Sequence, residues 1–125
     1  MRAARMFLPL LGLAGLVLGG CQQNMSPPKF ENGWLVYSGD HADVAAVCDG
    51  TPIRLTGDHT DVNLKGACTN VQLTGSHNDV DVAMAPGGQF EITGTSNDVW
   101  WHLARPGAPP VLINRGQQDA FHASR

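Results

Sequence analysis

A six-residue motif that occurs four times in this chain restricts its possible folds more than any other feature. Every copy has Gly in its first position, Asp in its fifth and Val in its sixth. The copies occupy residues 39–44, 57–62, 75–80 and 94–99, so their starting points lie 18, 18 and 19 residues apart. Self-similarity at a fixed period is the signature of a repeat architecture, in which each unit stacks on the one before it.

Pairs of apolar residues two positions apart recur at about half this period. Alternation of period two places both members of a pair on one face of a β-strand. The pairs begin at residues 35, 44, 53, 62, 71, 80, 90, 99 and 111, the last being Val111 and Ile113. The turns before every second strand share one vocabulary, as they would if each stacked on its own copy about 4.8 Å away. We therefore predict an all-β fold, a short parallel β-solenoid (β-helix) of four to five two-sided coils with about 18 residues in each.

The N-terminal segment has the pattern of an export signal. Arg2 and Arg5 precede an apolar run over residues 6–20, which is long enough for the core of a signal peptide and short for a membrane span. The run ends in Leu-Gly-Gly-Cys at residues 18–21, which resembles the lipobox of bacterial lipoproteins. That resemblance implies cleavage before Cys21 and acyl chains on its sulfur and amine, while an ordinary signal peptide followed by an incidental Cys is the alternative.

These features divide the chain and place it in the cell. We expect a lipoprotein signal peptide at 1–20, a lipidated Cys and flexible tether at 21–33, the solenoid at 34–115 and a C-terminal tail or cap at 116–125. The lipid would hold the mature protein on a membrane of the cell envelope. In the Gram-negative lipoproteins that the pattern resembles, Asp after the Cys favours the inner membrane, so the resemblance implies that Gln22 directs this protein to the outer membrane, facing the periplasm. Eight Lys and Arg against 11 Asp and Glu give a net charge of -3, which offers no basic field to a nucleic acid.

The cysteines predict a disulfide. Three are present, and lipidation of Cys21 leaves Cys48 and Cys68 in an oxidising compartment. Both lie in turns on the same side of the coil and one rung apart, so their Cα atoms can approach within the roughly 4.4–6.8 Å that a disulfide requires. Two buried free thiols are the alternative.

Two columns of polar side chains follow from the repeat. His41, His59 and His77 occupy equivalent turn positions. An Asp stands two residues after each of them, and the Asp positions are Asp43, Asp61, Asp79 and, in the fourth motif, Asp98. We expect the Asp side chains to accept hydrogen bonds from turn N–H groups. Binding of a transition metal ion by His41, His59, His77, Asp43, Asp61 and Asp79 is the alternative, and no cofactor is expected.

An enzyme is the third hypothesis. Asp residues about 5 Å apart would match the carboxyl pair of a retaining glycosidase, so an enzyme acting on polysaccharides is conceivable. Identical positions in identical turns, however, provide no means of separating the pKa values of an acid and its partner, and no insertion forms a cleft. We therefore expect no catalytic activity. Of the neighbours Trp100 and Trp101, one must face outward, where it either covers the coil end or contacts a glycan or protein partner.

The repeat resembles a bacterial family. The pattern is apolar-x-apolar-x-Gly-x-x-x-Asp/Thr-Val, with a Cys in one turn and another Cys about a coil later. It is similar to the cell-envelope repeat family called domain of unknown function 3060, and the similarity covers roughly residues 34–103. The resemblance implies an exported repeat domain without an assigned activity and supplies no catalytic residues. We expect a lipid-anchored, non-enzymatic binding or structural module of the envelope, whose partner is an envelope protein or a glycan.

Overall fold

Nine strands and no helix are present in the computed structural model, which describes residues 28–124. The strands are β1 (Lys29–Glu31), β2 (Trp34–Ser38), β3 (Asp43–Cys48), β4 (Ile53–Thr56), β5 (Asp61–Ser76), β6 (Asp79–Thr95), β7 (Asp98–Leu103), β8 (Val111–Asn114) and β9 (Ala120–Ala123). The lipidation site predicted at Cys21 and the signal peptide lie outside the described residues. Among the residues described, no helix is long and apolar enough to cross a membrane.

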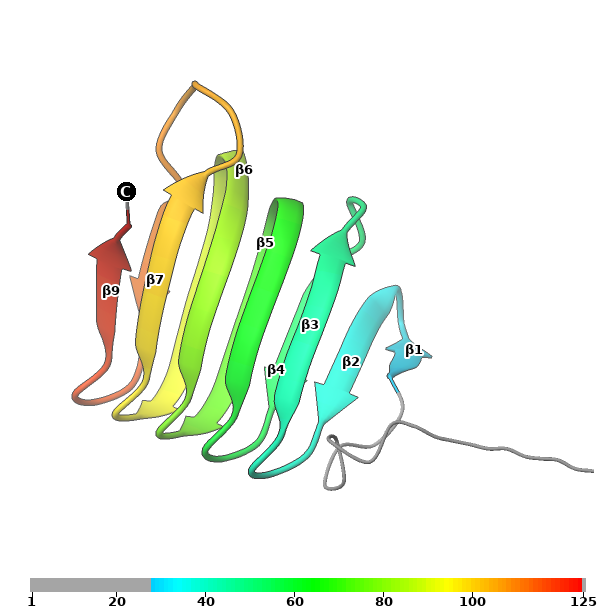
Figure 1. Cartoon of the computed structure of the whole chain (residues 1–125), viewed down its shortest axis with the longest axis vertical. Helices are drawn as coiled ribbons and strands as arrows, with labels where there is room; N and C mark the ends of the chain where they lie inside the picture. Colours follow the sequence, from blue (N-terminus) through cyan, green and yellow to red (C-terminus); the bar gives the residue numbers. More distant parts are fainter. Residues whose placement is uncertain (1–27, 125) are drawn as a thin grey trace, which may run out of the picture.

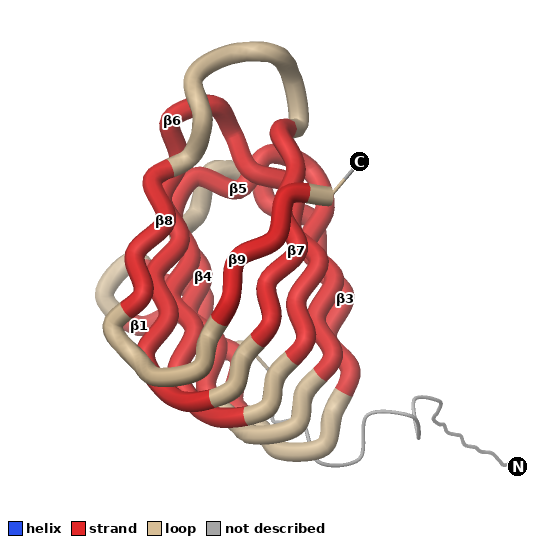
Figure 2. Tube along the Cα trace, turned by 90° about the vertical axis from the view of Figure 1, so that its left-hand side faces the viewer, coloured by secondary structure: helices blue, strands red, loops and turns tan. Residues whose placement is uncertain are grey.

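The strands form two sheets on opposite sides of a flattened coil (Figures 1 and 2). The front sheet consists of β3, the first parts of β5 and β6, β7 and β9. The back sheet consists of β2, β4, the second parts of β5 and β6, and β8. Every pairing within these two sheets is parallel, so the predicted parallel β-solenoid is confirmed.

The motif pairs with itself from coil to coil. Asp43 is the register partner of Asp61, which pairs with Asp79, which in turn pairs with Asp98. Hydrogen bonds between equivalent turn residues join positions 18, 19 and 22 residues apart. The last coil is longer because residues 104–110 form a loop between β7 and β8, which projects from the top of Figure 1.

The core consists of the apolar pairs that the sequence indicates. Phe90, Ile92 and Val99 are fully buried between the sheets. The final pair is an exception, since Val111 is 52% exposed, whereas Leu112 pairs with Phe90 and packs against the core. The prediction that Val111 and Ile113 face inward is therefore wrong by one residue.

The ends of the chain also differ from the expected division. Residues 29–31, expected within a flexible tether, form β1, which pairs antiparallel with β2. Asn32 and Gly33 connect the two strands with φ values of 53° and 86°, as a two-residue hairpin turn of this type requires. Residues 120–123, expected in a tail or cap, form β9 and add a final rung to the front sheet.

The Gly of the motif is required by close approach of the coils. A Cβ atom on Gly57, Gly75 or Gly94 would lie 1.8 Å from the carbonyl oxygen of the preceding motif Gly. These glycines also have φ values of 135–155°, which disfavour any other residue. The motif glycines therefore let consecutive turns stack directly on one another, along the lower edge of Figure 1.

Candidate functional site

The predicted disulfide between Cys48 and Cys68 is present, with a Cα–Cα distance of 5.0 Å. It joins the end of β3 to the bend in β5, next to the upper edge of the coil. Cys68 is buried and Cys48 is half-buried. The bond therefore fixes β3, the outermost strand of the front sheet, to the rest of the fold; among the described strands, β3 pairs only with β5.

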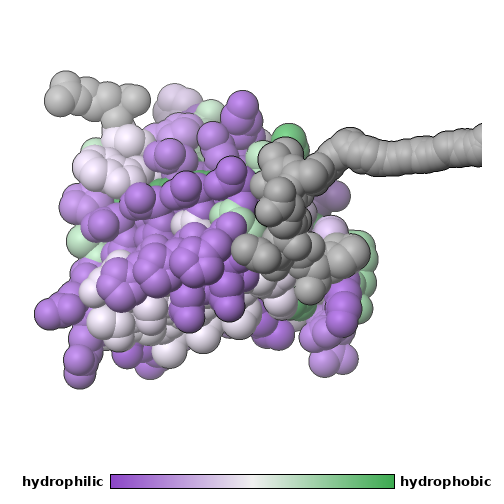
Figure 3. All heavy atoms as spheres, turned by 60° about the horizontal axis from the view of Figure 1, so that its bottom comes forward, coloured by the Kyte–Doolittle hydropathy of each residue, from purple (hydrophilic) through white to green (hydrophobic). Residues whose placement is uncertain are grey.

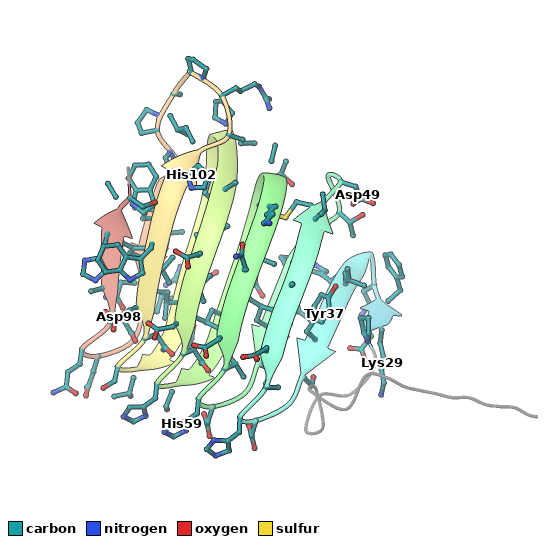
Figure 4. The ribbon with its side chains drawn as sticks, in the orientation of Figure 1. Lys29, Tyr37, Asp49, His59, Asp98 and His102 are labelled. Carbon is teal, nitrogen blue, oxygen red and sulfur yellow. A yellow bond between two sulfur atoms is a disulfide. The ribbon has the colours of Figure 1, made fainter. Side chains whose placement is uncertain are left out.

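The three histidines form a continuous stack along the turn edge, the His column. Ring centroids are 4.8 Å apart between His41 and His59 and 4.9 Å apart between His59 and His77, with interplanar angles of 9° and 5°. All three residues have φ between 53° and 58°, and their side chains are exposed. Figure 4 shows His59 directed away from the sheets, and the turn edge that comes forward in Figure 3 is largely hydrophilic.

This arrangement does not favour the metal hypothesis. Because neighbouring rings are nearly parallel, their nitrogens are displaced by about one rung instead of converging on one point. Within residues 28–124, no group of three or more His, Cys, Asp or Glu side chains has a geometry that could hold a metal ion. The His column is thus a stack of three exposed rings on the surface.

The four aspartates of the motif, the Asp column, do not accept the turn hydrogen bonds expected of them from any residue that the structure describes. They begin β3, β5, β6 and β7, and their side chains are exposed on the front sheet. The turn N–H groups are bound instead by the Asp at the second motif position: Asp40 accepts from the N–H of Asp58, and Asp58 accepts from the N–H of Ser76, both at 2.9 Å. The prediction identified the correct chemistry at the wrong position.

A buried polar ladder, which the sequence reasoning missed, occupies the fourth motif position. It consists of Thr60, Asn78 and Asn97, followed by Asp119 in the last coil. The Nδ2 of Asn78 donates to the carbonyl oxygen of Gly57 at 2.9 Å, and the Nδ2 of Asn97 donates to that of Gly75 at 3.0 Å. The Thr or Asn three residues after Gly57, Gly75 and Gly94 was the signal that could have identified this ladder.

An open groove lies on the front sheet beside the Asp column. Its volume is about 570 Å³. It is lined by Asp43, Val44, Ala45, Asp61, Val62, Asn63, Asp79, Val80, Asp81 and Trp100. In the part of the chain that the structure describes, no Lys or Arg forms a salt bridge with the aspartates of this groove. Partial burial raises the pKa of Asp79, and the neighbouring carboxylates of Asp98, Asp61 and Asp81 raise it further.

One end of the groove is a fixed aromatic wall. Trp100 is 42% exposed, and its ring stacks on that of His122 with centroids 4.1 Å apart and an interplanar angle of 21°. The Nε2 of His122 lies 3.1 Å from an oxygen of Asp98, which faces the viewer in Figure 4. Trp101 points to the opposite side and packs against the core. Of the two tryptophans, Trp100 is the outward one, and it offers an aromatic surface beside four carboxylates.

Comparisons with known proteins yield a family and nothing more specific. No curated protein and no solved structure matches this chain. The model of the family described as Protein of unknown function (DUF3060) matches residues 55–118, which is just over half of the chain. The matched segment runs from β4 to the turn before β9 and contains the polar ladder residues Thr60, Asn78 and Asn97 together with most of the groove. The chain therefore belongs to the DUF3060 family, as its repeat indicated.

Proposed function

We propose that this protein is an exported, lipid-anchored component of the cell envelope that acts as a non-enzymatic binding module through the groove beside Trp100. Two features support export: the Leu-Gly-Gly-Cys pattern at residues 18–21 and the disulfide between Cys48 and Cys68. Structural disulfides persist in oxidising compartments and are rare in the cytosol.

The observation that carries the binding role is the placement of Trp100. A large aromatic side chain that is already immobilised by stacking on His122 loses little conformational entropy when a partner covers it. Next to it, the carboxylates of Asp61, Asp79 and Asp81 have no cationic partner among the described residues. An aromatic face and adjacent carboxylates together attract a positively charged group, which can sit over the ring and between the carboxylates.

The spacing of the groove points to an extended partner. The Asp column places one carboxylate on each rung, about 4.8 Å from the next. A partner that carries several positive groups along its length, such as a basic protein segment or an amino-bearing glycan, can neutralise several of them at once. The proposed partner is therefore cationic and linear rather than a compact small molecule.

The same surface gives little support to a hydrolase. The members of the Asp column are exposed on a flat sheet, and the groove is open to solvent. A general acid and its ionised partner need environments that differ strongly, which an exposed row of identical turn positions does not provide. The raised pKa of Asp79 follows from partial burial and, after that, from crowding by like charges.

Lipidation and export are tested in cells. The full chain, expressed with its own leader in a bacterium, should incorporate an alkyne-tagged fatty acid and fractionate with membranes. Cys21→Ser should abolish both the label and the membrane association. Labelling that persists in the variant would refute lipidation of Cys21.

Binding is tested with the mature protein and two probes, fluorescent octalysine and a glucosamine oligomer, with the N-acetylated oligomer as the neutral control. At least one of the two cationic probes, octalysine or the glucosamine oligomer, should bind. Trp100→Ala and the double variant Asp61→Asn with Asp79→Asn should each weaken binding of that probe by about tenfold. The pair Glu31→Gln with Asp49→Asn makes the same change in net charge outside the groove and should retain wild-type affinity. Equal binding by all variants, or no binding of either cationic probe, would contradict the proposal.

A further inference from the structure

The two ends of the solenoid are finished differently. At the N-terminal end, β1 covers the outer edge of β2 by antiparallel pairing. At the C-terminal end, β8 pairs only with β6 and β9 pairs only with β7 among the described strands. Figure 2 looks onto this end, with β8 and β9 nearest to the viewer. Both sheets therefore end there in an open strand edge.

The direction of the backbone groups at this end follows from the printed hydrogen bonds. The N–H groups of Ala120 and Ser124 donate inward, to the carbonyl oxygens of Asn97 and Trp101. Because successive N–H groups of a strand point to opposite sides, those of Phe121 and Ala123 point outward. The inward bond from the N–H of Arg115 to Ile92 likewise leaves Leu112 and Asn114 with outward N–H groups.

These edges lack the devices that keep natural strand edges apart. The eight residues of β8 and β9 include no Asp, Glu, Lys, Arg or Pro. Their pairing with the neighbouring strands is continuous and contains no bulge. At the other end, β1, which covers β2, carries Lys29 and Glu31, and the open strand of the front sheet, β3, carries Asp43 and is fixed by the disulfide. Natural proteins protect exposed edges with charges, prolines or bulges, and an unprotected edge is a template for pairing with another strand.

Apolar side chains accompany the open edges. Leu112 and Phe121 pack against the core and are only half-buried, and Val111 is 52% exposed. The ring of Phe121 meets that of Phe90 edge to face, with centroids 5.8 Å apart. The last coil thus leaves part of the hydrophobic core uncovered on the same end that presents the free backbone groups.

We infer that this end is the contact between two copies of the chain, which associate C-terminal end to C-terminal end about a two-fold axis. A partner must present two strands at once, one for each sheet and at the separation of the sheets. A second copy does so, because rotation by 180° about an axis normal to the sheets maps each sheet onto itself and reverses its strands. β8 then pairs antiparallel with β8 of the second copy, and β9 with β9, in an isologous contact.

Charge permits the same end to meet itself. Arg115, which follows β8, forms a salt bridge with Glu91 of its own chain. One oxygen of Asp119, which precedes β9, accepts hydrogen bonds from the backbone N–H and the side-chain amide of Asn97. The strands themselves contain no Asp, Glu, Lys or Arg, so approach of two identical ends brings together no row of like charges.

The oligomeric state of the full mature protein, purified from membranes in detergent, tests the inference. Light scattering after size exclusion should give a protein mass of two chains. Val111→Lys with Ala123→Lys places two charges on exposed positions of the C-terminal end and should give a single chain. Ala45→Lys with Val47→Lys places the same charges on exposed positions of β3, the open edge at the other end, and should remain dimeric.

Hydrogen exchange provides a second measurement on the wild-type chain. The amides of Leu112, Asn114, Phe121 and Ala123 should exchange at least tenfold more slowly in the dimer than after dilution to the monomer, whereas that of Ala120 should be protected in both. A wild-type monomer at about 100 µM would overturn the inference. So would assemblies larger than two chains, or dissociation by the β3 substitutions and not by those in β8 and β9.

Discussion

Replacing Asp119 by Asn should stabilise the protein, because Asp119 is the one acidic member of the buried polar ladder. In Asn78 and Asn97, the amide Nδ2 donates to the carbonyl oxygen of a motif Gly. In Asp119 an oxygen, Oδ2, stands in place of that amide; it is buried and has no hydrogen-bond partner. Oδ2 lies close to the carbonyl oxygen of Gly94, because a Cβ atom placed on Gly116 would be 2.2 Å from the first and 2.0 Å from the second. Two hydrogen-bond acceptors are thus neighbours without a donor between them.

The size of the effect follows from the ladder. An Asn at 119 keeps Oδ1 as the acceptor for Asn97 and supplies the missing donor to Gly94. A buried acceptor without a partner costs about 1–3 kcal/mol, and a new neutral hydrogen bond contributes about 1 kcal/mol. We expect the free energy of unfolding to rise by about 2 kcal/mol, which for a domain of this size raises Tm by roughly 10 °C.

Urea and thermal unfolding followed by circular dichroism at pH 7 measure this difference. Asn97→Asp is the matched reverse change, because it places an oxygen opposite the carbonyl group of Gly75, and it should lower the free energy of unfolding by a similar amount. If Asp119→Asn left Tm unchanged or lowered it, the argument that the ladder requires a donor at each rung would be refuted.

Three further changes test other parts of the fold. Cys48→Ser with Cys68→Ser opens a link between residues 20 positions apart and should lower the free energy of unfolding by about 3 kcal/mol, which urea titrations with and without reductant will compare. Gly75→Ala should prevent folding or lower the free energy of unfolding by more than about 3 kcal/mol, because the added Cβ meets the carbonyl oxygen of Gly57. Gly87→Ala is the control in the same thermal unfolding experiments: its Cβ has no atom within 4 Å, so it should lose only the roughly 1 kcal/mol that a left-handed backbone costs. The pKa of Asp79 in the folded protein is raised above its ordinary value of 3.8, so the folded state binds a proton at this carboxylate more tightly than the unfolded state does. Protonation of Asp79 therefore increases the free energy of unfolding as the pH falls through the raised pKa toward 3.8. Asp79→Asn should therefore raise stability at pH 7 by less than about 1 kcal/mol, given the exposure of the side chain, and should reduce this increase on acidification; an unaltered pH profile between pH 3 and pH 7 would contradict it.

The repeat predicted the architecture well because successive coils contain the same motif and the same spacing of apolar residues. Up to Val99, the apolar pairs two positions apart indicated which residues of each strand face the core. The matching sequences of every second turn indicated parallel stacking of the coils. The prediction failed at Val111 because Val111, Leu112 and Ile113 are all apolar, so alternation of apolar and polar residues does not indicate which of them face the core. The register is set instead by pairing of Leu112 with Phe90 across a longer coil.

Side-chain roles in the turns were harder to predict than the coil. The motif contains two Asp positions in its first two copies, and the sequence alone does not say which one reaches the turn N–H groups. In the structure, the left-handed residues His41 and His59 lie between the two positions. The Asp at the second position accepts from the next turn, and the Asp at the fifth position is exposed on the front sheet. The hairpin at Asn32 and Gly33 was available from the sequence and was overlooked, because the strand before it has only three residues, two of which are charged.

The stacked motif glycines give the two edges of the coil opposite tolerances to changes in length. At the glycine edge, an oxygen of one coil lies where a side chain of the next would begin, so an inserted or deleted residue would displace every rung beyond it. At the other edge, the chain already accommodates a loop at residues 104–110 without loss of pairing between β6 and β8. New sequence, whether acquired in evolution or added as a peptide tag, can therefore enter at the loop edge, whereas growth of the domain itself should proceed by whole coils.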